Sequence, residues 1–114
     1  YLTDVNLHFI TGICKYLEIK TEIRFSSEFV LAEEKTQRLV DICRDLNVSD
    51  YYSGPAAKAY METEKFNNHN IDVHYWDYSN YPKYNQLHGE FEHAVSIIDL
   101  IMNEGPKSLE YLKF

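Results

Sequence analysis

Residues 50–60 read DYYSGPAAKAY, and this stretch decides the fold that the sequence predicts. It is typical of a short apolar strand that turns sharply into a helix. Gly54 is free to adopt the unusual backbone angles that such a turn needs, and Pro55 suits the first position of a helix. Ligands of open α/β sheets bind at the carboxyl ends of strands, where a helix N-terminus favours an anion. Ser53 and Gly54 are therefore predicted to bind an anion. The alternative is an ordinary strand-to-helix turn that binds no ligand.

Outward from this stretch, helical and strand-like spacings of apolar residues alternate. Two further strands are expected at residues 19–25 and 71–76, because apolar and polar residues alternate there. Helices are expected at residues 4–17, 33–46, 55–61, 92–103 and 108–114. This order predicts an α/β fold, with a small parallel sheet of about three strands flanked by helices, in a single domain or half-domain. So small a sheet has open edges, which suggests that strands are missing upstream.

The composition indicates one small acidic domain. The chain has 114 residues, with eighteen acidic and eleven basic side chains and a formal net charge of −7. That charge repels phosphate backbones, so nucleic acid and anionic membranes are not expected as partners. No apolar run approaches the ~18 residues that span a bilayer, and we expect a cytoplasmic protein with free thiols at Cys14 and Cys43. Because the sequence starts at Tyr1 and enters a helical pattern almost at once, we expect it to be a piece of a longer protein.

The predicted loop at residues 77–89 is long for a compact domain, which favours a functional role. Near its end lies His88, which is the best candidate for a general base because histidine is the side chain most often used for proton transfer. Gly89 lets the adjacent backbone approach a ligand closely, and Asp77 or Glu90 is placed to orient the ring. The alternative is a histidine that only satisfies a carbonyl of the loop.

No metal and no cofactor are expected. On a helix Glu92 would share a face with His88, but His93 falls one residue too far round to complete a metal site. Glycine-rich phosphate loops of the dinucleotide-binding or NTPase type are absent from the sequence.

Several further side chains are candidates for binding or catalysis. Asp99 interrupts an apolar run, so its carboxylate is either turned to solvent or buried with a partner; we expect it to be buried, for instance holding the His88 loop by hydrogen bonds. Lys58 is placed to meet an anionic group, or is simply solvated. Tyrosine is abundant, with ten in the chain, and its flat ring with a polar tip suits a sugar or a nucleotide. Tyr52 and Tyr81 are therefore candidates for lining a ligand, with packing between strands and helices as the alternative.

Two motifs together resemble a known family. One is the stretch from Leu46 to Tyr60, and the other is YNQLHGEF at residues 84–91, followed by SIIDL at 96–100 and NEG at 103–105. In this order they are similar to the C-terminal half of the WbqC-like family, over about residues 4–105. The resemblance implies a cytoplasmic role in making or decorating an activated sugar for O-antigen or other bacterial surface polysaccharides. It also implies roles for the positions that match the family motifs: Ser53, Gly54, Pro55, Tyr60, Gln86, His88, Gly89 and Asp99.

The chain departs from the family pattern in two respects. Family members often have proline near the position of His93, and the N-terminal half of the family, with its Gln-Pro and aromatic motifs, is not in this chain. Contacts with that half are expected, and if the site lies between the halves this chain alone should be inactive.

The leading hypothesis is a transferase that attaches an acyl or aminoacyl group to a nucleotide-linked amino sugar, with His88 and Asp99 as catalytic residues. The alternatives are a non-catalytic sugar- or nucleotide-binding module and a structural half-domain.

Overall fold

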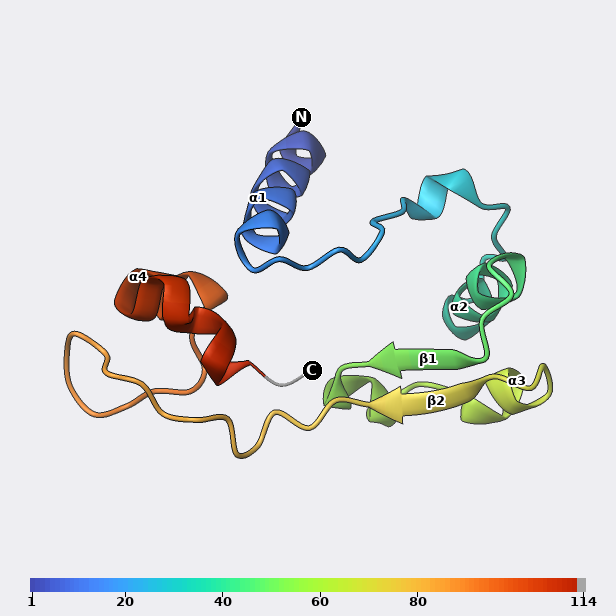
Figure 1. The fold of residues 1–114 in the computed structure, drawn as a ribbon. Helices are drawn as coiled ribbons and strands as arrows, with labels where there is room; N and C mark the ends of the chain where they lie inside the picture. Colours follow the sequence, from blue (N-terminus) through green and yellow to red (C-terminus); the bar gives the residue numbers. More distant parts are fainter. Residues whose placement is uncertain (113–114) are drawn as a thin grey trace. The chain divides into compact units, whose positions relative to one another are not determined.

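The computed structural model describes residues 1–112, so the last two positions of the helix expected at residues 108–114 lie outside the described residues. The chain forms two compact units, whose elements are labelled in Figure 1. The sheet unit comprises Ile23–Tyr78, and the helical unit comprises Tyr1–Glu22 together with the chain from Ser79 onward.

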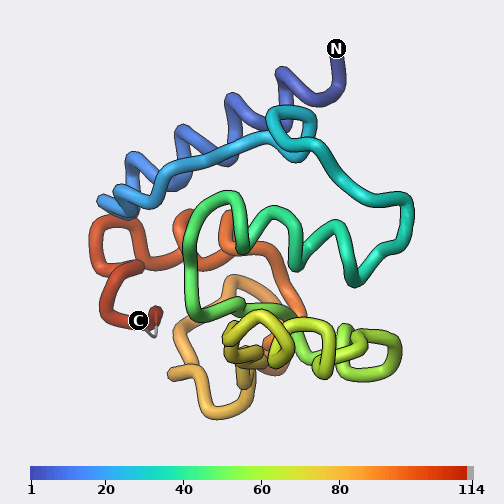
Figure 2. Tube along the Cα trace, turned by 90° about the vertical axis from the view of Figure 1, so that its right-hand side faces the viewer, coloured from blue at the N-terminus to red at the C-terminus, as the bar shows by residue number. Residues whose placement is uncertain are grey.

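The sheet unit is built on a parallel pair of strands. β1 (Asp50–Ser53) pairs with β2 (Asp72–Tyr75), and Figure 2 shows the connecting chain between them. The other elements of this unit are the 3-10 helices η1 (Ser26–Glu28) and η2 (Pro55–Ala59) and the helices α2 (Lys35–Asp45) and α3 (Thr63–Asn67). Parallel strands need a crossover connection, and η2 and α3 lie in the crossover from β1 to β2. Helices and a parallel sheet confirm the predicted α/β fold class.

The core of the sheet unit forms where α2, α3 and the sheet meet. Val40 and Cys43 come from α2, Phe66 from α3 and Ile71 from the residue before β2, and all four are buried. The ring of Tyr51 stacks on Phe66 with 5.0 Å between ring centroids and 26° between ring planes. The thiol of Cys43 is free, as expected, and burial raises its pKa.

The two faces of the sheet differ in what covers them. Side chains alternate along a strand, and Tyr51, Val73 and Tyr75 pack against the core on one face. Tyr52 and His74 form the next cross-strand pair and therefore point to the other face. We call this second surface the open face of the sheet.

The third strand expected at residues 19–25 is not formed: within the described residues the sheet has two strands. Local bonds direct the backbone into η1 instead, because Glu28 accepts a hydrogen bond from the Phe25 N–H at 2.7 Å and pairs with Arg24 at 2.6 Å. Ile23 and Phe25 remain exposed. Their alternating pattern has no core to cover it, and alternation favours a strand only where one face is buried.

The turn after β1 differs from the prediction in two ways. Pro55 begins a helix, as expected, but η2 is a 3-10 helix of only five residues. Gly54 has φ −70° and ψ 154°, an ordinary extended conformation, so the unusual backbone angles expected there are not used. A Cβ on Gly54 would lie 3.7 Å from the hydroxyl of Tyr78, which is an ordinary contact. Backbone strain is therefore not the reason for a glycine at this position.

The helical unit contains α1 (Leu2–Tyr16), α4 (Ile97–Glu104) and the 3-10 helix η3 (Gly105–Tyr111). The helix expected from residue 92 begins only at Ile97, where the Ser96 hydroxyl accepts a hydrogen bond from the Ile98 N–H. Gly105 ends α4 with φ 56°, a left-handed conformation that glycine adopts without strain.

Candidate functional site

A groove of about 500 Å³ opens on the sheet unit, and its size is typical of small-molecule sites. Its lining comes from α2, from the segment that precedes α2, and from Tyr60 after η2. The lining residues are Ser26, Leu31, Lys35, Arg38, Leu39, Ile42 and Tyr60. Two of them are cations and none is a carboxylate, which is notable in a chain of net charge −7.

One face of α2 provides most of this lining. Lys35, Arg38, Leu39 and Ile42 are spaced at i, i+3, i+4 and i+7, which places them along one side of a helix. The two cations and the two apolar side chains therefore reach the groove from a single rigid element. Tyr60, just after η2, completes the lining with an aromatic ring that is 64% exposed.

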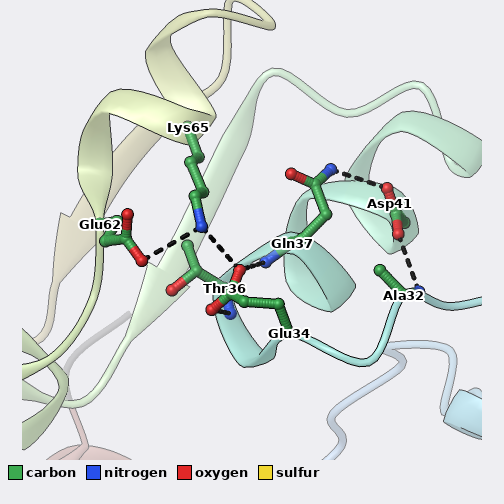
Figure 3. Close-up of polar contacts among 7 residues, drawn as sticks. All are labelled: Ala32, Glu34, Thr36, Gln37, Asp41, Glu62 and Lys65. Atoms are coloured by element: carbon green, nitrogen blue, oxygen red, sulfur yellow. Dashed lines mark hydrogen bonds and ion pairs between the residues drawn. The ribbon is translucent and has the colours of Figure 1, made fainter.

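The carboxylate nearest in sequence to these cations is bound elsewhere. Glu34 is the N-cap of α2 and accepts hydrogen bonds from the backbone N–H groups of Thr36 and Gln37, at 2.9 and 2.7 Å. It also pairs with the Lys65 ammonium at 2.8 Å (Figure 3). The hydrogen bond from Lys65, followed by those from the two backbone groups, lowers the pKa of Glu34 to about 2. Glu34 is thus held ionised by Lys65 and the start of α2.

A second carboxylate on α2 is also engaged. Asp41 accepts hydrogen bonds from the Gln37 side chain at 2.9 Å and from the Ala32 N–H at 3.2 Å (Figure 3). These two bonds, that of Gln37 first, hold the pKa of Asp41 below its usual value. Across the described chain, neither Lys35 nor Arg38 makes an ion pair with a carboxylate. The groove therefore presents two cations that are free to meet an anionic ligand.

In the helical unit, a polar network fixes the long loop that precedes α4. The Gln86 side chain accepts a hydrogen bond from the Glu92 N–H at 2.8 Å and donates one to the Glu92 carbonyl at 2.9 Å. It also donates to Asp99 Oδ2 at 3.0 Å, and the Tyr84 hydroxyl donates to the same oxygen at 2.7 Å. Burial, followed by this bond to Asp99, raises the pKa of Tyr84. Asp99 thus holds the loop by hydrogen bonds, as expected, although it is half-buried rather than buried; its predicted catalytic role stays a prediction.

His88 lies two residues beyond Gln86 in this loop and is exposed. Within the part of the chain that the structure describes, no hydrogen bond or ion pair joins His88 to another side chain, so Glu90 does not orient the ring as predicted. Asp77 belongs to the sheet unit, and its predicted role in orienting the ring stays a prediction. Gly89 follows with φ 71°, so its lack of a Cβ is used here. An exposed imidazole on an anchored loop is accessible to a substrate, and its predicted role as a base stays a prediction.

The predicted site residues divide between the two units. The sheet unit carries Tyr52, Ser53, Gly54, Pro55, Lys58, Tyr60 and Asp77. The helical unit carries Tyr81, Gln86, His88, Gly89 and Asp99. Of the first group, Tyr60 lines the groove and the Lys58 ammonium lies 5.1 Å from the centre of the Tyr75 ring. The proposal that the turn at Pro55 and the imidazole of His88 share one pocket stays a prediction.

The anion site predicted at the start of η2 also stays a prediction. A helix of five residues aligns few peptide dipoles, so it attracts an anion only weakly. The sequence reasoning missed Lys35 and Arg38. Their i, i+3 spacing beside Leu39 and Ile42 is visible in the sequence, but basic residues on an amphipathic helix are usually solvated. What distinguishes them is that Glu34 and Asp41 bond to other groups, and only coordinates show this.

No group of three or more His, Cys, Asp or Glu side chains among residues 1–112 is arranged to hold a metal ion. Among the helices described, none combines the length and the apolar character that crossing a membrane requires.

Comparison with known proteins gives a family and a relative. The model of the WbqC-like protein family matches residues 1–111. The uncharacterized protein Rv1507c of Mycobacterium tuberculosis is 39% identical over 113 residues, which are 99% of this chain and 49% of that protein. The chain thus spans about half the length of this relative. No solved structure matches the chain.

Proposed function

The chain belongs to the WbqC-like protein family, and from this premise we propose that it binds a nucleotide-activated sugar in the groove beside α2. The proposed setting is the cytoplasmic synthesis of a bacterial surface polysaccharide, the role that the family resemblance implies. One observation carries the proposal. Lys35 and Arg38 line a mainly apolar groove in an acidic chain, and within residues 1–112 they make no ion pair.

The lining matches the parts of a nucleoside diphosphate sugar. Arg38 can bind a phosphate with two parallel N–H groups, and Lys35 acts beside it as a point charge. Leu39 and Ile42 provide an apolar surface for the base or the ribose. Tyr60 adds an exposed ring whose flat face suits stacking against a base. The groove thus offers both charge for the diphosphate and apolar surface for the nucleoside.

The proposed reaction is transfer of an acyl or aminoacyl group to an amine of a nucleotide-linked amino sugar. The amine nitrogen attacks the carbonyl carbon of an ester or thioester donor, a C–N bond forms, and the bond to the alcohol or thiol breaks. His88 takes the proton from the amine and returns it to the leaving group, so no oxidant or cofactor is needed. What supports this role is an exposed imidazole on a loop fixed by Gln86 and Asp99.

Calorimetric titration with a nucleoside diphosphate sugar tests the binding proposal. An exposed cation 4 Å from a phosphate contributes about 1 kcal/mol in water, so the double variant Lys35→Gln with Arg38→Gln should raise Kd roughly 30-fold. The matched control is Lys107→Gln, an exposed lysine of the helical unit, which should leave Kd unchanged. Added salt should weaken wild-type binding. Equal Kd for the wild type and the double variant would eliminate the groove as the site.

The catalytic part is tested separately by mass spectrometry of the reaction products. His88→Ala in the intact protein should remove product formation while nucleotide-sugar binding stays within about twofold of the wild type. Unchanged turnover would refute the role of His88. Binding without any product in the wild type would assign the chain to the class of binding modules instead.

A further inference from the structure

The open face of the sheet carries a row of aromatic rings, formed by Tyr52, His74 and Trp76. Tyr52 stacks on His74 with 4.6 Å between ring centroids and 22° between ring planes. It also lies against Trp76, with 5.3 Å between centroids and 35° between planes. The Trp76 N–H donates to the Ser53 carbonyl at 2.9 Å, which continues the strand pairing beyond β2. The three rings are therefore held side by side by the sheet itself.

This aromatic row is exposed. Tyr52 is 54% exposed and Trp76 is 43% exposed, whereas the rings of the other face meet the core. Stacking and backbone pairing fix the rings before any ligand arrives, which lowers the entropic cost of binding. An ordered and exposed aromatic surface of this kind is typical of a binding site rather than of a core.

Carboxylates stand beside the row on the same face. The Asp50 carboxylate accepts a hydrogen bond from His74 Nε2 at 2.8 Å. The strand register places Asp72 directly opposite Asp50. Hydrogen bonds from Ser49 and then from His74 hold the pKa of Asp50 below its usual value. The open face thus combines aromatic rings with two exposed acidic side chains that accept hydrogen bonds.

We propose that the open face, through Tyr52, Trp76 and Asp50, binds an uncharged pyranose ring of a saccharide. A pyranose presents C–H groups on one face, which pack against an aromatic ring, and hydroxyl groups at its rim, which donate to carboxylates. The negative charge of Asp50 and Asp72 repels phosphates and acidic sugars, so the occupant is neutral. A purely apolar partner would cover the Asp72 carboxylate without offering it a hydrogen-bond donor.

This saccharide site is distinct from the groove. α2 lines the groove and packs against the core face of the sheet, through Val40 and Cys43. The aromatic row lies on the opposite face. The saccharide held there is therefore a separate ligand, such as a neutral unit of a longer glycan, and the proposal does not depend on the nucleotide sugar.

Titration with methyl glucoside and with a neutral gluco-oligosaccharide tests the site, followed by the fluorescence of Trp76, the single tryptophan of the chain. The expected Kd is in the millimolar range for the single sugar. Tyr52→Leu, at an exposed position, should raise Kd roughly fivefold or more. Tyr16→Leu, the matched control, changes a tyrosine that is 48% exposed outside the row and should leave Kd unchanged.

A second arm tests the charge of the site and does not depend on the ring. Methyl glucuronide, the acidic counterpart of methyl glucoside, should bind more weakly to the wild type. Asp50→Asn keeps a hydrogen-bond acceptor for His74 but removes the charge. It should therefore reduce the difference in Kd between methyl glucuronide and methyl glucoside. The proposal is overturned if the neutral sugars do not bind, if Tyr52→Leu binds them as the wild type does, or if the glucuronide binds as tightly as the glucoside. The double variant at Lys35 and Arg38 should bind methyl glucoside normally, so this proposal and that of the groove fail independently.

Discussion

Replacing Gln86 with alanine is expected to release the loop that carries His88. The Gln86 side chain closes a ring of bonds with the backbone of Glu92 and reaches Asp99 Oδ2 at 3.0 Å. Its fourth contact, to the Tyr84 hydroxyl, is 3.3 Å long and too weak to add much. Gln86→Ala removes all four contacts at once.

The expected effect follows from the exposure of the partners. A typical hydrogen bond contributes about 0.5–1.5 kcal/mol, and one to a charged group more. Glu92 is exposed, so water replaces Gln86 there and we take about 0.5 kcal/mol for each of those two bonds. Asp99 is half-buried, and its bond is taken as about 1 kcal/mol. The sum, about 2 kcal/mol, corresponds to roughly 30-fold more frequent opening of the loop.

Amide hydrogen exchange at Glu92 reports the loss of this anchor, because the Gln86 side chain is the acceptor of that N–H. Exchange should rise roughly 10- to 30-fold in Gln86→Ala. Asn85→Ala is the matched control: Asn85 is the preceding residue, it is exposed, and within residues 1–112 its side chain makes no hydrogen bond. An unchanged Glu92 amide, or an equal rise in the control, would refute the role given to Gln86.

Two further predictions concern the sheet unit. Phe66→Ala should lower the free energy of unfolding by about 3–5 kcal/mol, since Phe66 is fully buried; urea denaturation checks this, with exposed Phe9→Ala as the control, and a loss below about 1 kcal/mol contradicts it. The pKa of Glu34 is lowered from 4.5 to about 2, so the stability it adds is present above pH 4.5 and is lost as pH falls towards 2. The urea midpoints of Glu34→Gln and the wild type should therefore differ most near pH 7 and converge as pH falls towards 2. If the difference between the two midpoints does not change with pH, the ion pair with Lys65 does not stabilise the fold.

The sequence predicted those elements whose patterns are local and strong. α1 and α2 follow from apolar residues at helical spacing, and β2 from strict alternation over residues 71–76. The structural role of Asp99 was also within reach, because a carboxylate in an apolar run needs a hydrogen-bonding partner. The partners themselves, Tyr84 and Gln86, come from the loop expected to carry the site.

The errors arise where structure depends on distant partners. The alternation at residues 19–25 is as regular as that of β2, but no strand of the described chain pairs with it. The hydrogen bond from the Phe25 N–H to Glu28 stabilises η1 next to it instead. The groove could not be predicted either. Its lining joins Tyr60 to one face of α2, and a contact over such a long sequence separation leaves no periodic signal. Periodicity identifies which face of a helix is apolar, not which segment covers it.

Net charge is a coarse guide to ligands, because it does not show which carboxylates are already bonded. A total of −7 argues against a phosphate ligand when it is spread evenly over a surface. In the structure two acidic groups near α2 are already bonded: Glu34 to Lys65 and to the first backbone N–H groups of the helix, and Asp41 to Gln37. The cations of the groove are left to attract an anion, while Asp50 and Asp72 give the open face the opposite sign. We therefore expect the groove and the open face to favour ligands of different charge, because the local charge depends on where the charged side chains lie and not on their total number.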